Sequence, residues 1–370
     1  MSSSCGLLAS SEIRVQAPSV VVSWPSVPVE IVRATGFRPV IARGASDPTP
    51  AADAHLEAGI FPNRLRHLVE DALTGRLSSA ARIIVPRTSD ADYKCFLYLR
   101  ELVRIGAATA VPPTVLFDLL QSSGAEVRNY DVMRTRALLD DLASISGRMP
   151  SAGDLRQEIT RANAARAAAT RLVALRRVVP RVTGTDVFPL LAAFWELEPE
   201  RYVETAGDAA IRIAERPPLA GPRVLLAGAP VDGPALHEAV ESHGAVVVAE
   251  VGPWGSGAAG APVRVDDDPV TALADKYRAD SIGARTPVDA LRRWTERMLD
   301  DIDAVVVSLP PDDAVFGWDY PALRDRLQAR GVPHACLHGD PHEPLTAADH
   351  AALEAMVSAA ARRQEAPWHG

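Results

Sequence analysis

Short apolar runs alternate with amphipathic stretches along most of the chain. Runs typical of buried strands occur at 20–22, 39–41, 81–85, 223–226, 245–248, 303–307 and 334–337. Helical periodicity fills many of the intervals, as at 29–35, 63–74 and 92–104. Strands that alternate with helices of this length predict parallel sheets covered on both faces.

The middle of the chain lacks this alternation. Strand signals are scarce from Met133 to about Glu215, and Ser151 with Asp154 forms a capping box for a helix that reaches about Arg177. Further helices are predicted at 186–196, 200–216, 234–242, 268–278, 287–300, 320–330 and 346–363. The last begins with a second capping box, Thr346 and Asp349.

The pattern predicts an α/β protein with two Rossmann-like parallel-sheet domains joined by a helical segment. We place a polar arm at 1–18, the first α/β domain at 19–132, the helical connector at 133–216 and the second α/β domain at 217–370. A chain of 370 residues can bury two or three such cores. The two α/β halves show no residue-level repeat.

Composition narrows the function classes. The net charge is −8 and no basic block stands out, which argues against nucleic-acid binding. A continuous run of 18 apolar residues is absent, so we expect no membrane span, and without a convincing signal peptide we expect a cytoplasmic protein. The three cysteines, Cys5, Cys95 and Cys336, are far apart, so neither a disulfide framework nor a zinc pair is indicated.

Candidate chemistry lies on loops that follow predicted strands, where parallel sheets bind ligands. Ser89 and Asp90 follow the strand at 81–85, and they could act on a substrate or cap the next helix. Asp312 and Asp313 follow the strand at 303–307, and they could bind a cation, take a proton or face solvent. Trp318 and Tyr320 could form a pocket wall or anchor their loop.

A glycine-rich segment at 251–261 contains Trp254 and Ser256. It could form a phosphate cradle, but it lacks the lysine of a P-loop, so a flexible lid or a disordered loop is favoured. Asn63 is predicted to cap the helix that follows Pro62. His334, His338 and His342 are spaced by four residues across a strand end, which does not predict a metal site.

Four stretches together resemble the 2-hydroxyacyl-CoA dehydratase family, which includes the benzoyl-CoA reductase subunits. These stretches are 27–37, Pro86-Arg87-Thr88-Ser89-Asp90, Ser146-Gly147-Arg148 and Trp318-Asp319-Tyr320-Pro321. The resemblance implies three cysteines that hold an iron–sulfur cluster, near Pro62, Ser89 and Asp313. None of these residues is cysteine, so we expect this chain to carry no cofactor of its own.

The resemblance leaves three hypotheses open. The chain could be a cluster-free subunit that shapes an acyl-CoA site beside a homologous, cluster-bearing subunit. It could be a stand-alone enzyme of specialised metabolism, in which Ser89, Asp90, Asp313 and Glu30 do acid–base work. It could be a non-catalytic acyl-CoA-binding or scaffold protein. In each case we expect an acyl-CoA or related small molecule in a pocket between the two α/β domains, with Trp254, Ser256, Trp318 and Tyr320 as substrate-binding residues.

Overall fold

Two four-stranded sheets organise the computed structural model, which describes residues 18–258, 260–280 and 285–365. Every strand pair is parallel, and the strand orders are β2-β1-β3-β4 and β6-β5-β7-β8. The predicted fold class, α/β with two parallel sheets, is therefore confirmed. The polar arm predicted at 1–18 lies almost entirely outside the described residues.

The first sheet consists of β1 (Ser19–Val22), β2 (Arg38–Ile41), β3 (Arg82–Pro86) and β4 (Thr114–Phe117). The central strands β1 and β3 carry the apolar runs that the sequence pattern identified, and their side chains are almost fully buried. Strand β4 was not predicted. It lies at the edge of the sheet, and only its last residue is buried, so it lacks the continuous apolar signal of a central strand.

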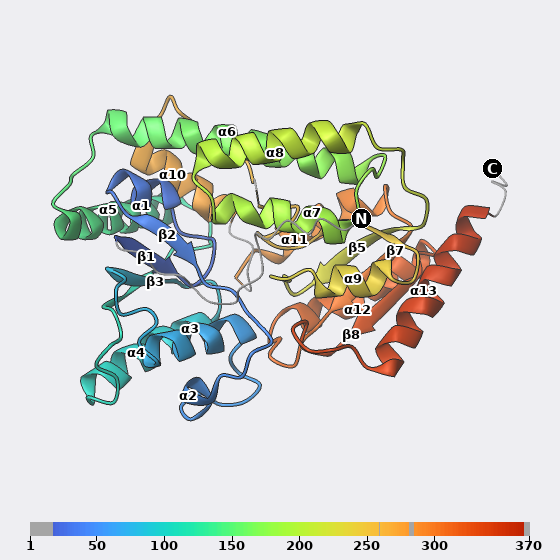
Figure 1. Cartoon of the computed structure of the whole chain (residues 1–370), viewed down its shortest axis with the longest axis horizontal. Helices are drawn as coiled ribbons and strands as arrows, with labels where there is room; N and C mark the ends of the chain where they lie inside the picture. The colour runs from blue at the N-terminus through green and yellow to red at the C-terminus, as the bar shows by residue number, and fades with distance from the viewer. Residues whose placement is uncertain (1–17, 259, 281–284, 366–370) are drawn as a thin grey trace. The chain divides into compact units, whose positions relative to one another are not determined.

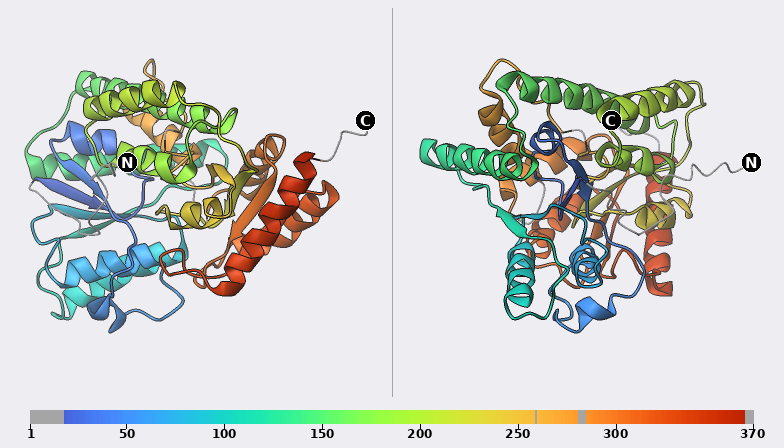
Figure 2. Two further views of the ribbon diagram at one scale, coloured as in Figure 1. Left: turned by 45° about the vertical axis from the view of Figure 1, so that its right-hand side comes forward. Right: turned by 60° about the vertical axis from the view of Figure 1, so that its left-hand side comes forward.

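Helices cover both faces of the first sheet. Helices α3 (Asn63–Leu73) and α4 (Asp90–Arg104) lie on one face, and α1 (Val29–Ala34) and α5 (Ala125–Ser146) lie on the other (Figure 1 and Figure 2). Leu65, Leu68 and Leu99 of α3 and α4 pack on Ile83 and Val85 of β3 in one hydrophobic core.

Two helices of this part of the chain were missed. The first is the single-turn helix α2 (Pro50–Asp53), which begins with a proline and was not among the predicted helices. The 22-residue helix α5 was not identified as a separate element. It starts after Gly124 and ends at Gly147, which adopts the left-handed conformation of a helix stop.

The helices of the middle region are α6 (Ala152–Arg177), α7 (Gly184–Ala192), a 3-10 turn at Ala193–Trp195 and α8 (Pro199–Ala214). By spatial contact the chain forms two compact units. The first contains residues up to 166 with 195–200 and 260–281, and the second contains 167–194, 201–259 and the residues from 282 onward.

The residues of the predicted connector, 133–216, are shared between the two units, and the predicted domain boundaries stay a prediction. The first unit also takes in α10 (Pro269–Ala279), which is distant in sequence. Helix α10 packs along α5, and the Arg128 guanidinium on α5 donates to the Asp275 carboxylate on α10 at 2.8 Å. Such contacts between distant segments are not visible in a local sequence pattern.

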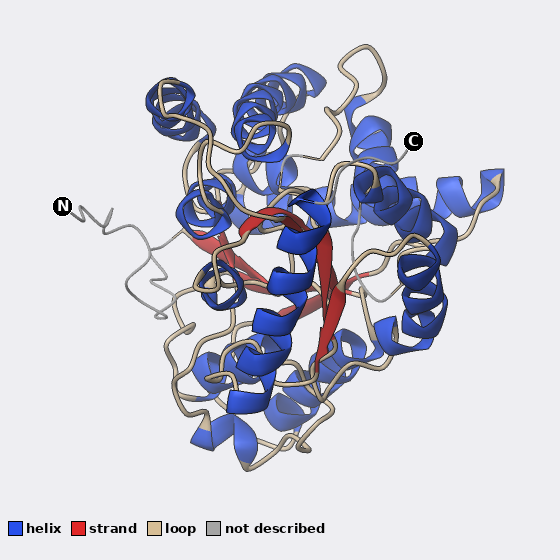
Figure 3. Ribbon diagram, turned by 90° about the vertical axis from the view of Figure 1, so that its right-hand side faces the viewer, coloured by secondary structure: helices blue, strands red, loops and turns tan. Residues whose placement is uncertain are grey.

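The second sheet consists of β5 (Arg223–Gly228), β6 (Val246–Glu250), β7 (Ala304–Ser308) and β8 (His334–Leu337). Its helices are α9 (Ala235–Glu241), α11 (Val288–Leu299), α12 (Phe316–Ala329) and α13 (Ala347–Glu365). In Figure 3, α13 runs across the near face of the strands, consistent with its contacts to β7 and β8. The strand order repeats that of the first sheet without a repeat in sequence.

The helix caps show where local reasoning succeeded and where it failed. Both predicted capping boxes form: the Ser151 hydroxyl accepts from the Asp154 amide, and the Thr346 hydroxyl accepts from the Asp349 amide. The predicted Asn63 cap is wrong. Helix α3 begins at Asn63 itself, and the side-chain oxygen of Asn63 accepts from the backbone amide of Ala45 at 2.9 Å. At this position the side chain holds the loop at Ala45 and does not cap the helix.

Within the described ranges, no helix combines the length and the apolar character that a membrane crossing requires.

Gly228, the last residue of β5, fixes how closely β5 and β7 approach each other. Its φ is +89°, and a Cβ atom at this position would lie 2.3 Å from the backbone oxygen of Ser308. Both the left-handed backbone and the contact exclude a larger residue.

We predict that Gly228→Ala destabilises the second unit by more than ~2 kcal/mol, because it combines the left-handed backbone penalty of ~1–2 kcal/mol with a backbone clash. Gly244→Ala is the matched control, since Gly244 has a φ of +86° with nothing near its Cβ position. Urea unfolding of both variants is the measurement. Equal losses of unfolding free energy would contradict the packing role of Gly228.

Candidate functional site

Each sheet reverses its strand order between its first and third strands, at β1/β3 and at β5/β7. Ligands of open parallel sheets bind beyond the carboxyl ends of the strands at such a reversal. The loops at these two edges contain most of the residues singled out in the sequence.

At the edge of the first sheet, Arg64 of α3 forms a buried ion pair with Asp92 of α4. The guanidinium donates to the Asp92 carboxylate at 2.8 Å and to the backbone oxygen of Ser23, just after β1, at 3.1 Å. The guanidinium carbon lies 4.6 Å from the centre of the Trp24 ring. The ion pair therefore links both helices of one face to the loop after β1.

Ser89 belongs to the same network. Its hydroxyl accepts from the Asp92 amide at 3.0 Å and donates to the Asp92 carboxylate at 2.8 Å, while the Thr88 hydroxyl donates to the same carboxylate oxygen. The interpretation of Ser89 as the cap of α4 is confirmed. Asp90 lies in the first turn with its side chain exposed, where a carboxylate stabilises the helix dipole. A substrate role for either residue stays a prediction.

Glu30, at the start of α1, is buried with 0% exposure in a second cluster of the first unit. Arg166 of α6 donates to one carboxylate oxygen, and the Tyr277 hydroxyl of α10 donates to the other at 2.8 Å. Burial alone would raise the pKa of Glu30, but the Arg166 guanidinium and the Tyr277 hydrogen bond keep it below its ordinary value. Glu30 is therefore held as a buried, paired carboxylate.

At the edge of the second sheet, Asp313 caps the start of α12. Its carboxylate accepts the backbone amides of Val315, Phe316 and Gly317 at 3.2, 3.0 and 2.7 Å. This explains why α12 begins at Phe316, four residues before the start predicted from the pattern. By accepting these three amides, the carboxylate acts as a helix cap.

The two aromatic residues of α12 differ in environment. The Trp318 side chain is 86% exposed, whereas Tyr320 packs at the margin of the second core near Cys336. Burial, followed by the interaction with the Cys336 thiol, raises the pKa of Tyr320. Tyr320 thus anchors its segment, and Trp318 projects from it.

The glycine-rich segment is built around Glu250, the last residue of β6. The Glu250 carboxylate is buried and accepts from Nη2 of Arg176 on α6 at 3.0 Å, with Nη1 of the same guanidinium 2.8 Å away in the ion pair. It lies 3.3 Å from the Nε2 atom of His237 on α9. Burial would raise the pKa of Glu250, but Arg176 and then His237 hold it well below its ordinary value. A fully buried carboxylate is stable only when it is paired in this way.

The predicted substrate-binding residues of this segment belong to that ion pair's surroundings. Ser256 accepts from Arg176 at 2.7 Å and donates its backbone amide to Glu250, and Trp254 is 0% exposed. A Cβ on Gly255 would lie 1.4 Å from a Glu250 oxygen, so glycine is required there. The expectation of a flexible or disordered loop is therefore corrected for its described residues, which enclose Glu250.

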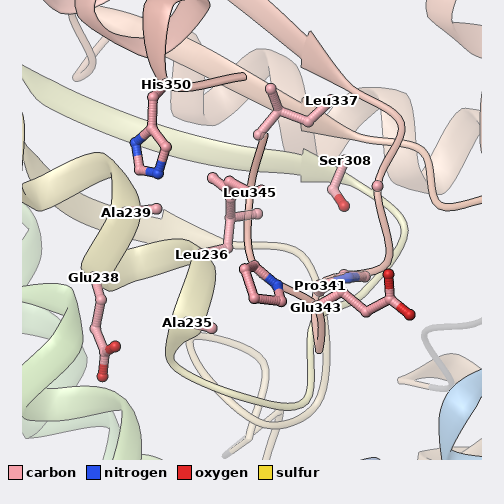
Figure 4. A pocket seen from close by; sticks show the side chains of 12 residues that line it. Ala235, Leu236, Glu238, Ala239, Ser308, Leu337, Pro341, Glu343, Leu345 and His350 are labelled. Atoms are coloured by element: carbon pink, nitrogen blue, oxygen red, sulfur yellow. The ribbon is translucent and has the colours of Figure 1, made fainter. Parts of the chain in front are cut away.

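A cavity of about 270 Å³ opens at the carboxyl ends of β7 and β8 (Figure 4). Its walls are Ala235, Leu236, Glu238, Ala239, Ser308, Leu337, Gly339, Pro341, Glu343, Pro344, Leu345 and His350. Sequence reasoning missed all of these residues as site candidates. The one available signal was that Ser308 directly follows the strand predicted at 303–307 and that Leu337 ends the strand predicted at 334–337.

The three histidines with a four-residue spacing do not converge. His342 pairs with Asp232, with Nε2 and Oδ1 2.7 Å apart, and His338 lies beside Cys336. Among the described residues, no cluster of three or more His, Cys, Asp or Glu side chains could hold a metal ion.

Comparison with known proteins identifies the family of the chain. A family model described as the 2-hydroxyglutaryl-CoA dehydratase D-component matches residues 26–357. No curated protein matches the chain.

An iron–sulfur cluster of the kind that the resemblance implied does not fit the residues near Pro62, Ser89 and Asp313. Clusters are held by thiolates, whereas Pro62 offers no side-chain ligand, and the Ser89 and Asp313 side chains are committed to helix caps. The nearby thiol, Cys95, is fully buried, and burial together with Asp92 raises its pKa to about 12. That thiol is therefore a neutral core group at ordinary pH.

We predict that Ser89→Ala lowers the unfolding free energy of the first unit by ~1 kcal/mol through loss of the cap, and that Asp92→Ala lowers it by ~3–5 kcal/mol because Arg64 is left unpaired. Ser122→Ala, in an exposed loop, serves as control. Urea titrations measure all three. An effect of Asp92→Ala no larger than that of the control would disprove the central place of the ion pair.

We predict that Glu250 makes the free energy of unfolding depend on pH in the acid range. Its pKa is depressed in the folded state, so its contribution is complete above the unfolded value, near 4.5, and is lost as the pH falls toward the folded value. Glu250→Gln should be less stable by ~3 kcal/mol or more at about pH 6, and should lose less than the wild type on acidification to about pH 3.5. Unfolding at both pH values, with exposed Glu354→Gln as control, is the measurement. If the wild type and Glu250→Gln lost the same amount of unfolding free energy on acidification, this role of Glu250 would be ruled out.

Proposed function

The chain belongs to the 2-hydroxyglutaryl-CoA dehydratase D-component family, and from this premise we propose that it is a cluster-free subunit that shapes an acyl-CoA site beside a cluster-bearing relative. The observation that carries the proposal is the state of Ser89. Its hydroxyl is engaged by Asp92, which is itself paired with Arg64. A position at which the family resemblance expects a ligand is thus part of a self-contained polar network.

The same geometry weighs against the stand-alone acid–base enzyme. Glu30 is buried between Arg166 and Tyr277, and the Asp313 carboxylate is occupied by three backbone amides. A general base must reach the proton that it removes, and these carboxylates are directed at the protein's own donors. Of the four acid–base candidates, Asp90 alone has an exposed side chain.

Trp318 supports a role in assembly. Tryptophan is highly buried on average, and it is enriched at the energetic centres of protein interfaces. Trp318 is 86% exposed on α12, close to the Asp313 cap that fixes the start of this helix. A large apolar side chain on a rigid helix is well suited to contact a partner subunit or the acyl-CoA that the partner binds.

In this proposal any cluster belongs to the partner chain, and this chain contributes binding surface. Ser256 acts indirectly, because it is hydrogen-bonded to Arg176 and Glu250, and Trp254 is buried in the same segment. Tyr320 supports the helix that carries Trp318. The acyl-CoA or related small molecule is the ligand that the family membership favours.

The test is co-expression with a family relative that carries the three cysteines, followed by measurement of complex formation and acyl-CoA binding. We expect a stoichiometric complex, and Trp318→Ala should weaken it by ~2 kcal/mol or more, about 30-fold in Kd. Ile211→Ala, which truncates another exposed apolar residue, is the control and should leave assembly unchanged. A monodisperse monomer that turns over an acyl-CoA without any relative would refute the subunit role.

A further inference from the structure

The cavity at the end of the second sheet has the position of a ligand site. It lies at the carboxyl ends of β7 and β8, next to the reversal of strand order, and all of its walls come from the second unit. Figure 4 shows α9 on one side and the segment from Leu337 to His350 on the other. A site formed by one unit exists without a contribution from the rest of the chain.

Ser308 gives the cavity a buried polar group. The residue is 3% exposed, and its hydroxyl makes no hydrogen bond to another of the described residues. In Figure 4 the hydroxyl projects from the end of β7 toward the segment with Pro341 and Glu343. The hydroxyl is accessible from the cavity, where a ligand can supply a hydrogen-bond partner for it.

The remaining walls determine what kind of molecule fits. Most are apolar, namely those of Ala235, Leu236, Ala239, Leu337, Pro341, Pro344 and Leu345. Such walls offer a water molecule few hydrogen-bond partners, whereas a stable buried water needs two to four. A volume of about 270 Å³ equals that of roughly nine waters, which suits a ligand of about that many non-hydrogen atoms.

Charge excludes a further class of ligand. The ionisable wall residues are Glu238, Glu343 and His350, and the His350 Nδ1 atom lies 3.3 Å from His243 Nε2. The Glu238 carboxylate projects away from the cavity in Figure 4, so Glu343 is the carboxylate that repels an anion and favours a neutral or cationic group. A CoA thioester, which is large and carries phosphates, is therefore the wrong molecule for this cavity.

We propose that the cavity is a second ligand site, for a small neutral or cationic molecule with an apolar body and one hydroxyl or amine group that hydrogen-bonds Ser308. The site is separate from the acyl-CoA role proposed above and does not depend on it. The apolar body packs against Leu236 and Leu345, and the Ser308 hydroxyl orients the polar end.

Binding of matched six-carbon probes to the full chain tests the proposal. Hexanol and hexylamine should bind in calorimetric titrations, and hexanoate should bind at least ~10-fold more weakly because of the Glu343 carboxylate. Ser308→Ala should weaken hexanol by roughly 2- to 12-fold, the factor for one lost hydrogen bond. Ser242→Ala, at an exposed serine of the same unit, should have no effect.

A space-filling variant separates the cavity from other surfaces. Ala239→Leu on α9 should abolish binding of all probes, whereas Ala355→Leu on the exposed face of α13 should preserve it. Melting temperatures verify the fold of each variant, and if Ala239→Leu does not fold, Ser308→Ala decides alone. No binding of any probe, hexanoate binding equal to hexanol, or binding unaffected by Ser308→Ala would overturn the proposal.

Discussion

The buried ion pair between Arg64 and Asp92 closes the carboxyl edge of the first sheet where its strand order reverses. The pair ties α3 to α4, holds the carbonyl of Ser23 after β1, and fixes the Ser89 and Thr88 hydroxyls after β3. Because an unpaired buried charge would cost several kcal/mol, neither partner can change alone. The edge that a ligand or cofactor would use is thus occupied by the protein's own charges.

The second unit also has a buried, paired carboxylate at the carboxyl edge of its sheet, formed by other residues. The Glu250 carboxylate at the end of β6 is neutralised by Arg176 and contacted by His237, and the glycine-rich segment folds over this group. Both sheets share one strand order without a repeat in sequence. Topology therefore determines where buried polar groups and cavities occur in this protein, while the identity of the residues at each edge determines the chemistry.

The elements that sequence predicted are those with local signals. Seven strands followed from apolar runs, and the caps at Ser151, Thr346 and Ser89 followed from short-range pairing of side chain and backbone. The edge strand β4 lacked such a signal. The arginine partners of Glu30 and Glu250 lie 136 and 74 residues away, so these ion pairs could not be inferred from spacing. The burial of Trp254 and the cavity around Ser308 likewise arise only when distant segments pack together.

Family membership and site chemistry thus point in different directions: the chain has the family's sheets, while its own side chains occupy the positions of the expected thiolates. The most direct test is anaerobic reconstitution of the purified chain with iron and sulfide, followed by metal and acid-labile sulfide analysis and electron paramagnetic resonance. We expect no stoichiometric iron and no cluster spectrum, with the same result for Cys95→Ala and Cys336→Ala. Several irons per chain with a cluster spectrum that disappears in either variant would contradict this expectation.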